Sequence, residues 1–191
     1  IISGDPLSIN SEILIKSWRQ LSSSIRKKIY LISNFSLLKQ QLEKLRYPSN
    51  SIRKVDSIDD NVESNVMKVI DIKIKFNDPF KVSKEASTKF VSNSFKVAHK
   101  LALRKDVMGI INCPINKKLL RKNLGVTELL ASKCKVKNNS EVMLIRNKSF
   151  SVTPITTHID IKSVSSKLTI NRIINKSITI NSWYKKIFKR K

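Results

Sequence analysis

The sequence predicts an α/β fold, a three-layer α/β/α domain with a mostly parallel, mixed sheet. Short apolar runs typical of strands alternate with longer stretches of helical periodicity, which is the pattern of layered α/β proteins. With 191 residues, of which 40% are hydrophobic, the chain can bury a sizeable core. A hairpin-like pattern around Asn147-Lys148 indicates that part of the sheet is antiparallel.

The first half of the chain supplies most of the predicted strands, namely 1–2, 28–32, 66–74 and a buried one at 107–111. Helices with one apolar face lie between them. The inward positions of the first two helices are Ile9, Ile13, Leu14, Trp18 and Leu21, then Leu37, Leu38, Leu42 and Leu45. Ser83 is placed to cap a third helix that runs to about Arg104, and Pro48 ends the second helix.

The second half predicts shorter elements and one long helix. Two short helices flank Gly125, and the segments 142–145 and 150–152 pair as a hairpin. A terminal helix over 169–189 is expected to turn four apolar side chains inward, those of Ile173, Ile174, Ile178 and Trp183. No repeat and no Gly-, Ser- or Pro-rich linker divides the chain.

The charge balance is strongly basic, with 38 lysines and arginines, 14 acidic residues and a net charge of +24. Such an excess is typical of a nucleic-acid-binding module, because cations neutralise phosphates. Compositional drift toward A/T-rich codons explains it equally directly, since Ile, Lys, Asn and Ser abound and there are 3 glycines. The lysines are dispersed, no aromatic set is spaced to stack bases, and the dense run 185–191 ends a helix. Drift is therefore favoured, and nucleic-acid binding is the alternative.

Compartment signals are few. No apolar run approaches the ~18 residues of a membrane-spanning helix, so no membrane partner is expected. The start, Ile1-Ile2-Ser3-Gly4-Asp5, lacks a methionine and a signal-peptide pattern, and we interpret it as the interior of a reading frame. Cys113 and Cys134 form neither a disulfide framework nor a CxxC pair. Two ordinary thiols in a reducing compartment predict a cytoplasmic protein.

Three polar segments follow predicted strands. They are Gly4-Asp5-Pro6, the stretch 112–117, and Thr156-Thr157-His158. In open α/β sheets, ligands bind beyond the carboxyl ends of the strands, where loops aim side chains from a rigid scaffold. We therefore expect a site at these loops, with His158 as its most informative residue because the chain has only 2 histidines.

Four short motifs and an ML pair then occur in a fixed order. A GDPxGIGPE-like start stands at 4–13, a (T/N)xPI(N/H)K segment at 112–117, a GHTE-like segment at 125–128, the pair Met143-Leu144, and a TTH segment at 156–158. In this order and at this spacing they resemble the 4-hydroxythreonine-4-phosphate dehydrogenase family of pyridoxal phosphate biosynthesis. The resemblance extends over essentially the whole chain, and the chain covers a little over the first half of the family's length.

The resemblance implies a fold similar to that of isocitrate and isopropylmalate dehydrogenases, incomplete in this chain. Residues 1–191 are then the N-terminal portion of a dehydrogenase, an α/β domain plus the start of the interface or second domain. The family is also homodimeric, with active sites at the subunit interface. The expected assembly is thus a homodimer, and the expected ligand is a small phosphorylated substrate. No specific nucleic-acid partner is expected.

The implied reaction is oxidation of 4-phosphooxy-L-threonine by NAD, followed by decarboxylation to 3-amino-2-oxopropyl phosphate. A divalent metal, Zn, Mg or Co, acts as a Lewis acid on the hydroxyl and the forming carbonyl. Further metal ligands and substrate-binding residues lie in the family's second half. We therefore expect this fragment alone to be inactive, and a non-catalytic remnant of the dehydrogenase is an alternative.

Three positions carry family site residues onto this chain. His158 matches the first metal-ligand histidine, and Thr127 matches a threonine that contacts substrate. Val126 stands where the family has a substrate-contacting histidine, and its side chain can neither donate nor accept a hydrogen bond. Each has a plainer interpretation, since His158 can simply bond a neighbouring hydroxyl and Thr127 can cap a helix. The catalytic and NAD-binding residues stay unassigned.

Other motif positions also allow two interpretations. Asp5 is either a turn residue before Pro6 or part of the site, and Lys117 is favoured as a solvated lysine. Ser8 and Asn10 replace two family glycines, and a positive φ there suits Asn10 better than Ser8.

Overall fold

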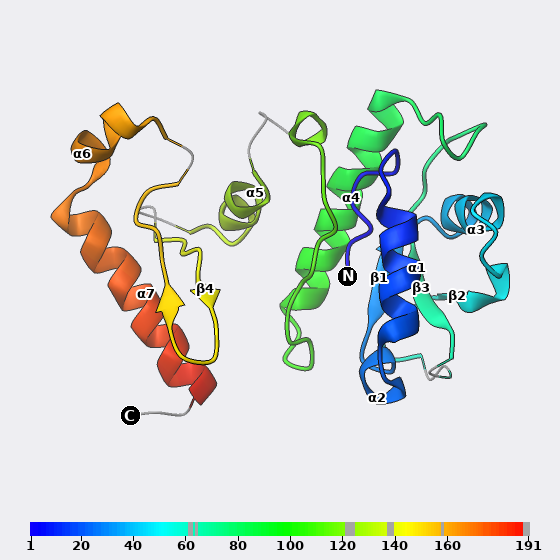
Figure 1. Cartoon of the computed structure of the whole chain (residues 1–191), viewed down its shortest axis with the longest axis horizontal. Helices are drawn as coiled ribbons and strands as arrows, with labels where there is room; N and C mark the ends of the chain where they lie inside the picture. The colour runs from blue at the N-terminus through cyan, green and yellow to red at the C-terminus, as the bar shows by residue number, and fades with distance from the viewer. Residues whose placement is uncertain (61–62, 64, 121–124, 137–139, 158, 189–191) are drawn as a thin grey trace. The chain divides into compact units, whose positions relative to one another are not determined.

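A computed structural model describes residues 1–60, 63, 65–120, 125–136, 140–157 and 159–188. The chain divides into two compact units, 1–124 and 125–191, and each is described by itself. Figure 1 shows the elements of both in chain order. None of the described helices is long and apolar enough to cross a membrane.

A parallel sheet of three strands forms the centre of the first unit (Figure 1). Its strands are β1 (Tyr30–Ser33), β2 (Ile52–Val55) and β3 (Met67–Asp71), in the spatial order β1-β3-β2. Both neighbouring pairs are parallel, which confirms the predicted sheet. β2 was not predicted, because its sequence Ile-Arg-Lys-Val has apolar residues only at its two ends.

The chain start and the segment before Asn112 extend the β1 edge. Ile2 forms isolated parallel bridges with Ile32 and Asn112. The expected buried strand over 107–111 is wrong, since this segment is not a strand and Met108 and Ile111 are exposed. Among the described residues, the backbone of this segment pairs with the sheet only near Ile2. No described element covers the Met108 and Ile111 side chains.

Helices cover both faces of the sheet and give the three predicted layers. α1 (Asn10–Gln20) and α3 (Phe35–Lys44) share one buried cluster with the strand residues Leu31 and Val69. Successive strand residues point to opposite faces, so Ile32 points to the other side, and α4 (Lys84–Ala102) contacts β1. The buried residues of the first cluster are Leu14, Ile15, Trp18, Leu31, Leu38, Leu42, Ile52, Met67, Val69 and Cys113.

The N-termini of α4 and α1 differ in how they are capped. The Ser83 hydroxyl accepts a hydrogen bond from the Ala86 amide at the start of α4, which confirms the predicted cap. The first helix differs from expectation, because Ile9 is its N-cap and both Ile9 and Ile13 are exposed. The shorter elements of this unit are α2 (Ser23–Arg26), η1 (Ser49–Ser51) and η2 (Lys117–Leu119).

The second unit contains a hairpin and a long helix. The predicted hairpin is confirmed as β4 (Ile145–Arg146) paired antiparallel with β5 (Ser151–Val152), a separate two-stranded sheet. The predicted terminal helix is α7 (Ile170–Phe188). Its shorter companions are α5 (Val126–Lys133), η4 (Ile161–Ser163) and α6 (Val164–Lys167).

The inward face expected for α7 is wrong. Ile173, Ile174, Ile178 and Trp183 are between 38% and 58% exposed. α7 makes polar contacts within this unit, such as the hydrogen bond between the Tyr184 and Ser151 hydroxyls. The helical period places Ile173, Ile174 and Ile178 on one side of α7, but no described element of the unit buries that side.

Candidate functional site

Two of the three predicted loops are joined by hydrogen bonds at the carboxyl edge of the parallel sheet. The Asp5 amide donates a hydrogen bond to the Pro114 carbonyl at 3.4 Å. The Asn10 side-chain amide donates to the Ser3 carbonyl at 2.9 Å and to the Pro114 carbonyl at 2.8 Å. One buried side chain at the start of α1 therefore connects the loop after residue 3 with the loop after residue 112.

Gly4 makes this close approach possible. Its φ is +76°, which L side chains rarely adopt. A Cβ built on Gly4 would lie 2.7 Å from the Pro114 carbonyl oxygen and 2.8 Å from Asn10 Nδ2. The glycine of the first motif is therefore required both by backbone conformation and by lack of space.

The next motif residues act as turn residues. Asp5 Oδ1 accepts from the Leu7 amide at 2.9 Å, and the Ser8 hydroxyl donates to the Asp5 carbonyl at 2.8 Å. Of the two interpretations of Asp5, the turn role is thus the one observed. Neither Ser8 nor Asn10 has a positive φ, so both replace family glycines without backbone strain.

The loop after residue 112 ends in a short helical turn. Asn116 caps η2, accepting from the Lys118 amide at 3.0 Å. Lys117 is exposed, which fits its interpretation as a solvated lysine. Cys113 is buried beneath this loop, and burial raises the pKa of its thiol. The cysteine is thus an inert core residue, as expected from its sequence context.

The GHTE-like motif forms the start of α5. Gly125 is the N-cap, so the interpretation of Thr127 as the helix cap is wrong. Thr127 is exposed, Val126 is half-buried, and both lie in the first turn. The Glu128 carboxylate folds back toward Gly125, where its negative charge favours the helix N-terminus. The Thr127 hydroxyl is therefore accessible to a ligand at the beginning of a helix.

The predicted metal ligand, His158, lies outside the described residues. Its neighbours Thr156 and Thr157 are half-buried, and Asp160 is exposed just before η4. Among the residues that the structure describes, no group of three or more His, Cys, Asp or Glu side chains could hold a metal ion. This motif belongs to the second unit, whereas the two joined loops belong to the first.

At the sheet edge, Gln41 was missed altogether from the sequence, and Asn10 was named only as a replacement for a family glycine. Gln41 is 4% exposed and donates to the Pro6 carbonyl at 2.9 Å and to the Pro79 carbonyl at 2.8 Å. It follows Leu37 and Leu38 at helical spacing on the buried face of α3. A polar residue on an apolar helical face was the available signal, because buried polar groups need partners.

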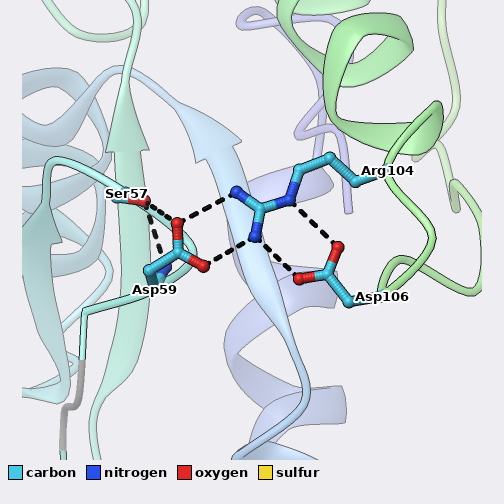
Figure 2. Close-up of polar contacts among 4 residues, drawn as sticks. All are labelled: Ser57, Asp59, Arg104 and Asp106. Carbon is cyan, nitrogen blue, oxygen red and sulfur yellow. Dashed lines mark hydrogen bonds and ion pairs between the residues drawn. The ribbon is translucent and has the colours of Figure 1, made fainter.

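A charged cluster connects the loop after β2 with the end of α4 (Figure 2). Arg104 bonds both oxygens of Asp59, at 2.7 and 2.9 Å, and both oxygens of Asp106, at 2.7 and 3.0 Å. Hydrogen bonds from Arg104, then from Ser57, lower the pKa of Asp59 to about 2. The three charged side chains are exposed, so the cluster fixes a surface loop and is not a desolvated reactive site.

The buried lysines are the most unusual basic side chains. Lys68 is 2% exposed, donates to the Lys27 carbonyl at 2.5 Å and lies 3.8 Å from the centre of the Tyr30 ring. Lys176 of α7 is 5% exposed and donates to the Glu141 carbonyl. Burial lowers the pKa of both amines. These two cations therefore hold backbone segments in place and are hidden from external phosphates.

A layered α/β unit with motif loops joined at the carboxyl edge of a parallel sheet defines an open α/β protein, the class in which ligands bind at that edge. The family model described as "Pyridoxal phosphate biosynthetic protein PdxA" matches residues 25–191. The chain belongs to this pyridoxal phosphate biosynthetic family.

Two curated relatives carry the name 4-hydroxythreonine-4-phosphate dehydrogenase. The protein of Sulfurihydrogenibium sp. (strain YO3AOP1) is 31% identical over 98% of this chain and 58% of its own length. That of Erythrobacter litoralis (strain HTCC2594) is 26% identical over 94% of this chain and 54% of its own length. The chain thus spans a little over half the length of these relatives.

Solved structures of proteins with the same name share the fold. The crystal structure from Klebsiella pneumoniae superimposes with a TM-score of 0.85 and 25% identity, over 97% of this chain and 57% of that chain. The structure from Burkholderia phymatum gives a TM-score of 0.77 and 22% identity, over 94% of this chain and 55% of that chain. The mostly parallel α/β fold class predicted from sequence is confirmed, as is the resemblance to the N-terminal portion of this family.

Proposed function

We propose that this chain is the N-terminal portion of an NAD-dependent dehydrogenase that oxidises 4-phosphooxy-L-threonine. The oxidised product then loses carbon dioxide to give 3-amino-2-oxopropyl phosphate in pyridoxal phosphate biosynthesis. The observation that carries the proposal is the family match over 25–191, together with relatives named for a dehydrogenase of this substrate. The first unit serves as the α/β domain, and the second unit begins the interface or second domain.

The substrate role is assigned to the start of α5. Thr127 offers an exposed hydroxyl in the first turn, where the helix dipole favours an anionic group. Val126 contributes only apolar surface at the position of a family histidine. A phosphorylated substrate therefore loses one polar contact here, and Thr127 carries the remaining one.

The metal is proposed for the complete enzyme, with His158 as one ligand. A divalent ion needs several donors, and neutral imidazole suits Zn²⁺ and similar ions. The described residues hold no cluster with enough donors, so they do not by themselves fit the ion. When bound, Zn, Mg or Co supplies a Lewis acid for the hydroxyl that is oxidised. NAD is the proposed oxidant, and no residue is assigned to it.

A homodimer is the proposed assembly, in the cytoplasm. The hairpin and α7 expose large apolar side chains, including Ile145 at 61%, Phe150 at 64% and Ile178 at 58%. Exposed apolar surface of this kind typically marks an interaction site. Sedimentation should show that Ile178→Asp weakens self-association, whereas Ser177→Asp, at the adjacent exposed position, leaves it unchanged. A monomeric parent protein would refute the homodimer.

Activity is tested with the longest polypeptide that the reading frame encodes. With 4-phosphooxy-L-threonine and NAD, we expect NADH and carbon dioxide to form in equal amounts. The 191-residue chain alone should form neither, because the remaining ligands and substrate contacts are missing. A folded full-length product that forms no NADH with any of the three metals would refute the enzyme and favour a non-catalytic remnant.

Nucleic-acid binding is kept as a second candidate because of the net charge of +24. We expect weak binding that is indifferent to sequence and falls steeply with salt, as for any basic surface. Fluorescence anisotropy with duplex and single-stranded oligonucleotides measures it. A specific site bound with nanomolar Kd at physiological salt would favour this candidate over the enzyme.

A further inference from the structure

A small cavity with both polar and apolar lining residues lies in the first unit, at the carboxyl edge of the sheet. Its volume is about 10 Å³, and its polar lining comes from the first loop, the start of α1, the end of β1 and α3. One buried water needs roughly 10–15 Å³ of such space and two to four polar partners. The polar residues that line it are Ser3, Asp5, Asn10, Ser11, Ser33 and Gln41.

Asn10, one of the lining residues, has a side-chain acceptor without a hydrogen-bond partner among the described residues. Its side chain is 2% exposed, and Nδ2 donates to the Ser3 and Pro114 carbonyls. Carbonyl oxygens can only accept, so the amide cannot be turned around to place Oδ1 against them. Oδ1 is buried and has no hydrogen-bond partner among the described residues. A buried amide oxygen is costly unless a donor reaches it.

Gln41 presents a second acceptor of fixed orientation. Its Nε2 donates to the Pro6 and Pro79 carbonyls, so the same reasoning assigns its other terminal atom as Oε1. Both amides therefore use their donors on loop carbonyls and keep their oxygens as acceptors. A ligand that fits this lining must be small and must donate a hydrogen bond. The Ser11 and Ser33 hydroxyls can serve as its further hydrogen-bond partners.

We propose that this cavity binds one ordered water molecule, which donates a hydrogen bond to Asn10 Oδ1 and bridges the start of α1 to β1 and α3. The water and the Asn10 amide together hold the loop that contains Gly4 and Asp5 in one conformation. The site lies wholly within the first unit, and the inference does not depend on the proposed enzymatic activity.

A crystal structure of the 191-residue chain tests the proposal directly. We expect a density peak within hydrogen-bonding distance of Asn10 Oδ1 and of at least one other polar atom of the lining. An empty cavity, or a side chain that moves in to fill it, would overturn the proposal. The wild-type protein suffices for this experiment, so no variant needs to fold.

Two serine variants provide a matched test in solution. Ser33 lines the cavity, whereas Ser87 is 1% exposed, has an unpartnered hydroxyl and lies outside the lining. Ser33→Ala removes a partner of the water and should lower the Tm by about 2–4 °C. Ser87→Ala removes a buried hydroxyl with nothing to bond and should leave the Tm unchanged or raise it. Equal Tm changes in the two variants would contradict the proposed water.

Discussion

The two units of this chain treat their apolar residues in opposite ways. In the first unit, Leu, Ile, Val and Phe side chains from both faces of the sheet are buried, and Phe90, Val91 and Phe95 of α4 are almost inaccessible. In the second unit, no described hydrophobic side chain is buried, and Lys176 is its one buried residue among those described. The same helical periodicity therefore produced a core in α4 and an exposed apolar face in α7.

Helical periodicity in the sequence therefore predicts which residues share a helix face, but it does not predict whether another element covers that face. The apolar face of α4 lies against the sheet of its own unit, whereas that of α7 has no described cover within its unit. About 25 cal/mol of stabilisation is associated with each Å² of buried apolar surface, so the first unit carries most of the chain's own stability. Exposed apolar surface like that of the second unit typically marks an interaction site.

The largest expected effect comes from breaking the core of the first unit. Phe90 is 1% exposed, and Phe90→Ala should lower the free energy of unfolding by about 3–5 kcal/mol. Ile178 is 58% exposed, and Ile178→Ala should change it in the monomer by less than about 0.5 kcal/mol. Urea denaturation at low protein concentration measures both. Similar losses in the two variants would contradict the contrast between the units.

A smaller effect is expected at the loop that the first unit holds rigid. Gly4→Ala must adopt a φ of +76° and meets Pro114 and Asn10, so it should cost about 1–3 kcal/mol of stability. Gly109 has nothing within 4 Å of a built Cβ and no positive φ, which makes Gly109→Ala the control. If thermal unfolding shows the two variants to be equally stable, the loop is not constrained as described.

The smallest effect is expected at the exposed cluster of Arg104. The pKa of Asp59 is lowered to about 2 in the folded state, so the folded protein favours the charged carboxylate. The resulting stabilisation is present above the unfolded pKa of about 3.9 and is lost as the pH falls through 2. Between pH 4 and pH 2 the wild type should therefore lose more stability than Arg104→Gln. Parallel stability curves over this range would show that the cluster contributes nothing.

The parts of the fold that were predictable from sequence carry strong local signals. α4 has a capping serine and a long apolar stripe, and the hairpin has its turn at Asn147. β2 escaped prediction because only its two terminal residues are apolar, and it is recognised only by pairing with β3. The expected strand over 107–111 was wrong for the converse reason, since an apolar run is buried only where another element covers it.

The candidate site was predictable in part. The loops at Gly4 and Pro114 lie together at the carboxyl edge of the sheet, as expected, although the segment 107–111 before the second loop is not a strand. The connecting roles of Asn10 and Gln41 were not predicted because most of their partners are backbone carbonyls distant in sequence. His158 lies outside the described residues, so its role as a metal ligand stays a prediction.

The two histidines of the chain offer the most direct test of the proposal that the chain is part of a metal-dependent dehydrogenase. In the longest polypeptide of the reading frame, His158→Ala should lower NADH formation from 4-phosphooxy-L-threonine at least about 100-fold, since even outer-shell changes cost 10–100-fold. His99→Ala, on α4 of the first unit, should leave the rate within a few fold. Unchanged turnover in His158→Ala would contradict the account.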